Sequence, residues 1–286
     1  MPDLDAAEQF LAATARVLER HRFAHLFRGA GGAPVRAAVL PYRNPDGGFG
    51  HALEPDGRTP HSQPAAVDFA LHVLHDAGEW DAEVADGACN WLQRTAPAQG
   101  GVTFVDPSVE GWPHAPWWVP EAGLPPSLIF TGLIAGTLHA AGHRHPWLDR
   151  ATELLWERID GVEEAGAYEL RGLLRFLDRV PDRDRARAAV DRLAPAIRAV
   201  VTLDPDAEGE VHGPLDFAPY PDSLARVLFD EATIEAHLDH LAAAQRDDGG
   251  WMFNWLAWSP VAEAEWRGVV TIEALVTLRA NGRLEP

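Results

Sequence analysis

The feature that most constrains this chain is a short phrase that it contains twice. Residues 43–49 read Arg-Asn-Pro-Asp-Gly-Gly-Phe, and residues 245–251 read Gln-Arg-Asp-Asp-Gly-Gly-Trp. Adjacent glycines allow the positive φ angles that end a helix, and the aromatic ring beyond them can fold back as an apolar plug. A helix stop that occurs twice predicts a structural unit that is repeated.

A second pattern points to the same repeat. Three strongly apolar stretches end in a similar way, at Leu74 to Gly78, Leu138 to Gly142 and Leu278 to Gly282. Glycine just beyond a helix end is common, so one instance would mean little. Three instances after comparable stretches predict equivalent helices of a repeating architecture.

The periodicity of apolar residues predicts helices throughout, and no alternating run is long enough to predict a strand. Ser62 is a plausible N-cap for a helix that has Pro64 in its first turn. We expect an all-α fold of about five to six helical hairpins in one domain, residues 1–286. The expected inner helices are the helix that has Pro64 in its first turn, whose apolar residues continue to Leu74, and those over 126–141, 166–179, 221–230 and 267–281. The expected outer helices cover 82–95, 146–159, 183–201 and 231–245. An N-terminal helix covers 5–21, and a shorter apolar piece covers 35–42.

The C-terminal phrase resembles a known family motif. Gln245, Gly249 and Trp251 spell Gln-x-x-x-Gly-x-Trp, which is similar to the repeat of squalene and other terpenoid cyclases. Looser Asp-Gly-Gly-aromatic forms occur in the β subunits of protein prenyltransferases. The resemblance implies an α/α toroid, in which the hairpins close into a barrel around a central cavity. The N-terminal copy departs from the motif with Arg43 and Phe49, and a third, degenerate copy lies at 100–102.

The catalytic residues of those families do not carry over. Terpenoid cyclases that protonate their substrate use Asp-x-Asp-Asp, and Asp182-Arg-Asp184-Arg is only a partial match flanked by arginines. Prenyltransferases bind catalytic zinc through aspartate, cysteine and histidine, but the lone Cys89 falls on an expected outer helix. We interpret Cys89 as a packing residue. The resemblance therefore supports the fold better than any activity.

Composition narrows the classes of partner. The formal net charge is −19, and all 24 basic residues are arginine. This acidic balance argues against nucleic acid and anionic membranes, and the absence of lysine excludes a lysine Schiff base. A single cysteine excludes an internal disulfide. No signal peptide or membrane-spanning run is apparent, so we expect a cytoplasmic protein. No nucleotide-binding motif predicts a cofactor, and the oligomeric state stays open.

The densest polar stretch follows the first Asp-Gly-Gly phrase. It contains His51, Glu54, Asp56, Arg58 and His61, in an expected loop between two helices. Two close carboxyl groups push their pKa values apart, which suits acid-base catalysis. Glu54 and Asp56 are the candidate acid and base, and the other three would position them. The alternative is a solvated loop whose charges pair with one another. Two histidines and two carboxylates are possible metal ligands, but their spacing matches no metal-binding pattern and we predict no metal.

Aromatic residues gather in two other expected loops. They would line an apolar cavity and stabilise cationic intermediates, or stack on sugar rings, or plug one end of the barrel. Polar candidates near them are Tyr220 and Asp222, of which Asp222 also suits an N-cap, and three glutamates that could form an acidic rim. The candidate binding residues are Trp112, Trp117, Trp118, Trp255, Trp258, Tyr220 and Asp222, with Glu121, Glu263 and Glu265 as the rim.

The leading functional hypothesis is an enzyme that binds or converts a hydrophobic small molecule, isoprenoids included, in a tryptophan-lined cavity. A second hypothesis is a carbohydrate-active toroid of the glycosidase or lyase type, which would use carboxylates and tryptophan stacking. A third is a binding scaffold without catalysis.

Overall fold

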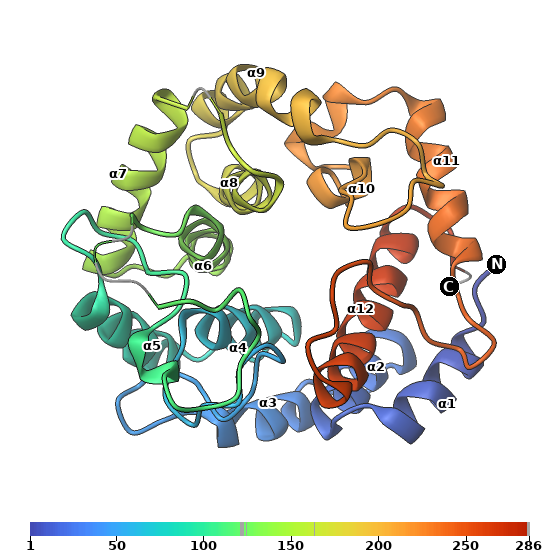
Figure 1. Cartoon of the computed structure of the whole chain (residues 1–286), viewed down its shortest axis with the longest axis horizontal. Coiled ribbons are helices and arrows are strands. Elements are labelled where there is room, and N and C mark those ends of the chain that lie inside the picture. The colour runs from blue at the N-terminus through green and yellow to red at the C-terminus, as the bar shows by residue number, and fades with distance from the viewer. Residues whose placement is uncertain (121–122, 124, 163, 285–286) are drawn as a thin grey trace. The chain divides into compact units, whose positions relative to one another are not determined.

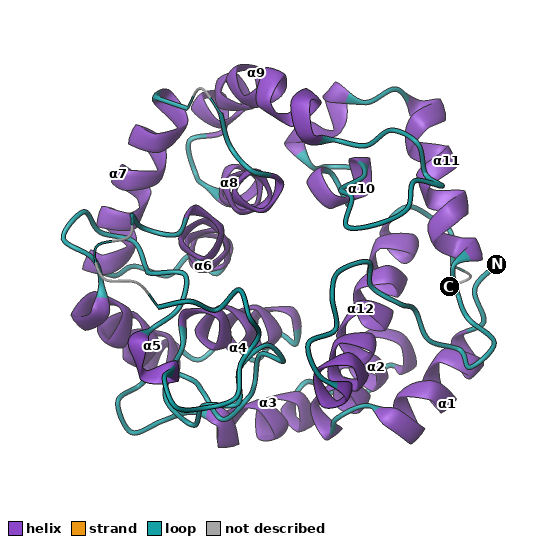
Figure 2. Ribbon diagram, viewed as in Figure 1, coloured by secondary structure: helices purple, strands orange, loops and turns teal. Residues whose placement is uncertain are grey.

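All regular secondary structure that the structure describes is helical (Figure 2). The computed structural model describes residues 1–120, 123, 125–162 and 164–284. Within this part, β-pairing is limited to isolated bridges, so the all-α prediction is confirmed. The helices are α1 (Leu4–Thr14), α2 (Val17–Arg28), α3 (Ala33–Val39), α4 (Pro64–Asp76), α5 (Ala82–Thr95), α6 (Leu128–Ala140), α7 (Pro146–Asp160), α8 (Ala167–Arg179), α9 (Arg183–Val200), α10 (Pro214–Phe217), α11 (Glu231–Ala243) and α12 (Pro260–Ala280), with short 3-10 helices η1 (Leu40–Tyr42), η2 (Pro107–Val109) and η3 (Leu224–Leu228).

The chain forms two compact units. The middle unit is Gly31–Ala196, and the terminal unit combines Met1–Ala30 with Ile197–Pro286. Each unit is described by itself below. A single domain over residues 1–286, and its closure into a toroid, stay predictions.

The middle unit has two layers of helices. Helix α6 packs between α4 and α8, while α5 and α7 pack against each other and against this row (Figure 1). The apolar helices predicted as inner members therefore form one layer, and the amphipathic helices predicted as outer members form the other. Each charged outer helix buries one apolar stripe, as α7 does with Trp147, Leu155 and Ile159.

Helices α6 and α8 approach each other at backbone distance. A Cβ added to Gly132 would lie 2.2 Å from the carbonyl oxygen of Gly172, and one added to Gly172 would lie 2.5 Å from the Cα of Ile129. Glycine is destabilising inside an isolated helix. Here it allows the two helices to touch, which explains glycines in the middle of an otherwise strongly apolar segment.

The terminal unit is built around α12. This helix packs against α1, α2 and α11. Its buried Ile272 and Leu275 belong to one apolar cluster with Phe10, Leu11 and Trp251. The N-terminal helices and the C-terminal helix thus share one core, although more than 200 residues separate them.

Three local predictions were wrong. The helix expected over 5–21 is two helices, because the chain becomes extended at Ala15 and Arg16. The helix expected over 221–230 is only the 3-10 helix η3, after the short α10. Gln63 rather than Ser62 is the N-cap residue of α4, and the Ser62 hydroxyl instead donates to Asp46.

The three similar helix ends are equivalent. Gly78, Gly142 and Gly282 have φ angles of 66°, 65° and 70°. In each, the glycine N–H bonds the carbonyl three residues earlier, and the next N–H reaches back five residues, for example from Glu79 to Leu74 at 3.0 Å. These are Schellman-type ends, which satisfy the last carbonyls of the helix. The pattern read from the sequence therefore marks one recurring way of ending a helix.

The two Asp-Gly-Gly turns also share one structure. In each turn the N–H of the second glycine donates to the aspartate Oδ1, at 2.9 Å for Gly48 on Asp46 and 3.1 Å for Gly250 on Asp248. The carbonyl of that same glycine accepts a backbone N–H from four residues earlier, at 2.9 Å in both copies. The repeated phrase encodes a repeated turn.

The first glycine of each turn presses against another helix of its unit. Gly249 has a φ of 90°, and a Cβ on it would lie 2.2 Å from the carbonyl oxygen of Ala6 in α1. Gly47 has a φ of 94°, and a Cβ on it would lie 2.4 Å from the carbonyl oxygen of Gly87 in α5. Both the backbone angle and the space require glycine. Each turn is thus a backbone-to-backbone joint, which we call the glycine joint.

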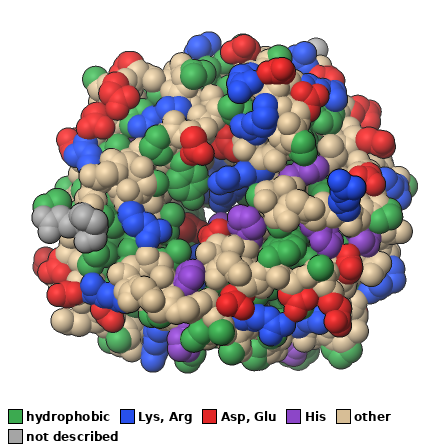
Figure 3. All heavy atoms as spheres, turned by 180° about the vertical axis from the view of Figure 1, so that it is seen from behind, with side chains coloured by type: hydrophobic (Ala, Val, Ile, Leu, Met, Phe, Trp, Pro, Cys, Tyr) green, Lys and Arg blue, Asp and Glu red, His purple; other side chains and the backbone are tan. Residues whose placement is uncertain are grey.

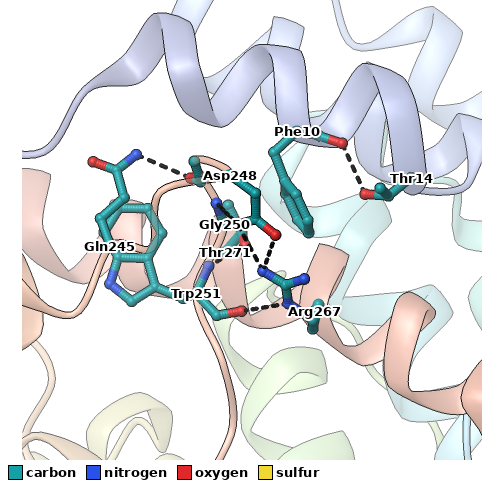
Figure 4. A network of polar contacts seen from close by, with 9 residues as sticks. Phe10, Thr14, Gln245, Asp248, Gly250, Trp251, Arg267 and Thr271 are labelled. Carbon is teal, nitrogen blue, oxygen red and sulfur yellow. Dashed lines mark hydrogen bonds and ion pairs between the residues drawn. The ribbon is translucent and has the colours of Figure 1, made fainter.

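Gln245 and Arg267 secure the C-terminal joint (Figure 4). The Gln245 Nε2 donates to the carbonyls of Gly249 and Asp3, at 2.9 and 2.8 Å. Arg267 in α12 makes two hydrogen bonds of 2.8 Å to Asp248. Burial opposes ionisation of Asp248, but the Arg267 guanidinium outweighs it and lowers the pKa of that carboxyl. The turn is therefore tied to α1 and α12 together.

The degenerate third copy behaves like the C-terminal one. The N–H of Val102 donates to the Thr131 hydroxyl in α6 at 3.1 Å, and the N–H of Trp251 donates to the Thr271 hydroxyl in α12 at 3.0 Å. In both copies the residue after the second glycine donates its N–H to a threonine hydroxyl, although this residue is Val102 in one copy and Trp251 in the other. The repeat thus has at least three members.

Replacing Gly249 by alanine tests the glycine joint. We expect the free energy of unfolding to fall by more than about 2 kcal/mol, because the Cβ meets the backbone of α1 and the φ angle is unfavourable. Gly29 is the matched control: its φ is 69°, and nothing lies within 4 Å of an added Cβ. Gly29→Ala should cost only about 1 kcal/mol. Urea denaturation measures both; equal losses would contradict the joint.

Candidate functional site

The predicted catalytic residues lie in a loop of the middle unit, which we call the acidic loop (residues 51–63). It connects η1 to α4, as expected from the sequence. It begins with a strained backbone, because His51 and Ala52 have φ angles of 55° and 59°. Non-glycine residues rarely adopt this region, and such strain is held only where surrounding contacts determine it. Here the fully buried Leu53 follows at once and anchors the turn.

A second loop, which we call the tryptophan loop (residues 106–118), pairs with the acidic loop. The N–H of Arg58 donates to the Pro113 carbonyl at 2.8 Å, and the N–H of Ala115 donates to the Asp56 carbonyl at 2.7 Å. At the far end the buried Gln63 side chain accepts the N–H of Asp106 at 2.9 Å. The two loops therefore hold each other in place.

The two carboxylates of the acidic loop are buried. Glu54 is 9% exposed and Asp56 is 6% exposed. The Asp56 backbone N–H donates to Glu54 Oε2 at 2.8 Å, and the Trp117 indole N–H donates to Asp56 Oδ2 at 3.0 Å. Buried carboxylates need such donors. The candidate acid and base are thus placed by the fold and do not belong to a solvated surface loop.

Two of the three tryptophans beside them present their rings to solvent. Trp112 is 43% exposed and Trp117 is 36% exposed, whereas Trp118 is 2% exposed. Trp118 packs on Gly57, where an added Cβ would lie 2.5 Å from the indole ring. Trp118 therefore acts in the packing of the two loops, and the exposed rings of its two neighbours are the available binding surface.

The other polar candidates of the acidic loop have partners of their own. His51 Nε2 hydrogen-bonds Asn44 Oδ1 at 2.9 Å, and the His61 ring meets the Trp112 ring edge to face at 6.3 Å. Arg58 donates from its side chain to the Pro55 carbonyl at 2.8 Å. Of the predicted cluster, the structure thus brings His61 next to the exposed tryptophan surface and turns His51 toward Asn44.

The remaining predicted binding residues belong to the terminal unit. Trp255 stacks on Phe253 at 4.5 Å, and Trp258 is half-buried. Tyr220 is half-buried and Asp222 is exposed; Ser223 rather than Asp222 is the N-cap residue of η3. Of the predicted rim, Glu263 and Glu265 lie in the first part of α12, and Glu121 lies outside the described residues.

The partial match to the cyclase motif, Asp182 and Asp184, lies at the start of α9. Asp182 Oδ1 accepts the N–H of Arg185 at the start of α9, and the Asp184 side chain is 98% exposed beside Arg187. This partial acidic motif therefore lies at a helix start on the surface.

Among the described residues, no group of three or more histidine, cysteine or acidic side chains is placed to hold a metal ion.

The structure also contains a pocket that the sequence did not predict. It has a volume of about 510 Å³ and is lined by Leu40, Arg43, Asn44 and Pro45, at the first Asp-Gly-Gly turn. Asn44 connects it to the acidic loop through its bonds to His51 and to the Pro60 carbonyl. The one signal in the sequence was Arg43, which stands where the C-terminal copy has glutamine.

On the face drawn in Figure 3, acidic and arginine side chains are mixed with apolar ones. In the part of the chain that the structure describes, no helix combines the length and the apolar character needed to cross a bilayer.

Comparison with known proteins finds a similar fold but gives no information on function. Neither a protein-family model nor a curated protein sequence matches this chain. A crystal structure of a protein from Actinoplanes matches with a TM-score of 0.62 over 98% of both chains, at 16% sequence identity. At that identity the similarity shows a shared fold alone.

Cys89 provides a test of the buried layer between the helices. It is fully buried in α5, and desolvation, with a smaller effect of Asp86, raises the pKa of its thiol to about 12. Because the thiolate is the reactive form, we expect no reaction with Ellman's reagent in the folded protein at pH 8. One thiol should react after denaturation. Rapid reaction of the native protein would contradict this assignment.

Proposed function

We propose that the paired acidic and tryptophan loops form the binding site of an enzyme that acts on a hydrophobic small molecule. Trp112 and Trp117 hold the ligand, and Asp56 exchanges a proton with it. One contact carries the proposal: the Trp117 indole donates to the buried Asp56 carboxylate at 3.0 Å while Trp117 as a residue stays 36% exposed. A ligand lying on that ring would be within reach of the carboxylate.

The side chains around Asp56 have distinct roles in this proposal. Glu54 is a positioning residue, because its carboxylate accepts the Asp56 backbone N–H and braces the loop. Trp117 both orients Asp56 and contributes a binding face. His61 stands beside Trp112 and can relay a proton to or from a ligand on that ring. This division follows the general rule that a positioned group within hydrogen-bond reach performs the proton transfer.

The resemblance of the C-terminal phrase to terpenoid cyclases and protein prenyltransferases supports an apolar ligand, isoprenoids included. Indole faces bind apolar chains and stabilise cations by about 0.5–2 kcal/mol per contact. A cationic intermediate would therefore be favoured beside Trp112 and Trp117. The acidic composition, with 43 acidic against 24 basic residues, fits a neutral or cationic ligand better than an anionic polymer.

The exposure of Trp112 and Trp117 also favours a second candidate, a carbohydrate-active enzyme. Exposed indole rings at a loop pair stack on sugar rings, and a pair of carboxylates is the usual catalytic apparatus for glycosidic bonds. Glu54 and Asp56 would then share the acid and base roles. This candidate differs from the first in the ligand that the same surface accepts and in the role of Glu54.

Three variants of the full chain test the proposal. Farnesol and maltotetraose serve as apolar and sugar probes, with binding followed by native mass spectrometry and conversion followed in the same samples. Trp117→Phe should weaken probe binding at least about tenfold, because it removes the indole donor and part of the face. Asp56→Asn should retain binding and lower conversion by at least about a hundredfold.

Asp184→Asn is the matched control, since it removes an exposed carboxylate of the same unit. It should leave both binding and conversion unchanged. Binding of farnesol alone supports the hydrophobic-ligand enzyme, and binding of maltotetraose alone supports the second candidate. Conversion that survives in Asp56→Asn would place the chemistry elsewhere and refute the catalytic role of this loop.

A further inference from the structure

Arg43 occupies an unusual position in the repeated phrase. It is the counterpart of Gln245, which begins the C-terminal copy. Gln245 is fully engaged: its Oε1 accepts the N–H of Asp3 at 2.6 Å, and its Nε2 donates to the carbonyls of Asp3 and Gly249. In the first copy this position is Arg43, whose side chain is longer than that of glutamine and positively charged. An arginine at this position would be expected to bind an anionic group in place of the backbone groups that Gln245 binds.

No such partner is present within the residues that the structure describes. The Arg43 side chain makes no hydrogen bond or ion pair there, and its Nε is buried without an acceptor. This is notable in a chain with 43 acidic residues. The nearest acidic residue in the phrase, Asp46, directs its Oδ1 to the Gly48 N–H and the Ser62 hydroxyl instead.

The position of the guanidinium depends on a glycine in α5. A Cβ added to Gly87 would lie 2.5 Å from an Nη atom of Arg43. The absence of a side chain at Gly87 thus leaves room for the guanidinium beside the glycine joint. Packing therefore holds the Arg43 guanidinium in position without a protein anion beside it among the described residues. Such a group is preorganised to bind an anionic ligand.

Arg43 also lines the pocket of about 510 Å³, together with Leu40, Asn44 and Pro45. Pockets of a few hundred Å³ accommodate small organic ligands. The Asn44 amide is already committed, since it donates to the Pro60 carbonyl and the Ser62 hydroxyl and its oxygen meets His51. Arg43 is therefore the lining residue with donors to offer, and Leu40 and Pro45 provide apolar contact.

We propose that this pocket binds the oxyanion end of a small molecule, a carboxylate or a phosphate group, and that Arg43 recognises it. The planar, cationic guanidinium matches the oxygen geometry of both groups. The carbon skeleton of the ligand rests on Leu40 and Pro45. The site is separate from the proton transfer proposed for Asp56 and does not depend on it.

The test uses the ¹⁵N-labelled full chain at low ionic strength. Inorganic phosphate and, in a separate series, acetate are titrated while backbone amide shifts are recorded. We expect saturable shifts at Asn44 and its neighbours for at least one of the two anions. Phosphate alone would identify phosphate esters as the ligand class, acetate alone would identify carboxylates, and both would identify oxyanions in general.

Arg43→Gln restores the residue of the C-terminal copy, so the turn should still form. It should weaken anion binding at least about tenfold. Arg94→Gln is the matched control: Arg94 is an exposed arginine whose guanidinium bonds the Asp46 carbonyl, and its loss should leave the affinity unchanged. Shifts that do not saturate with either anion, or equal affinity in Arg43→Gln and the unmodified protein, would overturn the proposal.

A second measurement needs no variant. Phenylglyoxal modification of the unmodified protein, mapped by peptide mass spectrometry, reports each arginine separately. Saturating anion should slow the modification of Arg43 and leave that of Arg94 unchanged. Equal rates at Arg43 with and without anion would refute the site even if Arg43→Gln failed to fold.

Discussion

The glycine joint is the contact on which the packing of the helices depends. At Gly249 and at Gly47 the chain turns with a positive φ angle and presses its backbone onto a helix of the same unit, with no space for a Cβ. At the C-terminal joint, Ala6 and Gly249 are 243 positions apart in the sequence, yet their backbones touch. Such a joint fixes the distance between two helices more strictly than side-chain packing does, because backbone atoms cannot adopt another rotamer.

Around each joint, the residues that flank the Asp-Gly-Gly turn differ between the two copies. The aspartate and both glycines are the same in the two full copies, whereas glutamine becomes arginine and tryptophan becomes phenylalanine. Gln245 uses its amide to bind Asp3 and Gly249. Arg43 instead lines a pocket. The repeat therefore supplies a common scaffold, and its variable positions are where a distinct binding function can arise.

The candidate site depends on contacts between separate loops. Asp56 lies in the acidic loop, but its indole donor comes from Trp117 in the tryptophan loop. The backbone bonds at Arg58 and Ala115 bring the two loops together. Of the three tryptophans in the tryptophan loop, Trp112 and Trp117 are exposed and Trp118 is buried. This combination of buried carboxylates and open aromatic faces is the basis of the function proposed for the middle unit.

The all-α class, most helix positions, the three equivalent helix ends and the repeated turn could be predicted from the amino-acid sequence. These features follow from local causes: apolar periodicity, capping, and glycine at positive φ angles. The sequence did not predict the break at Ala15 and Arg16 or the 3-10 character of η3. The hydrogen bond of Trp117 to Asp56, that of His51 to Asn44 and the place of Arg43 in a pocket follow from the three-dimensional fold. Burial and pairing arise between residues distant in the chain, and no local pattern encodes them.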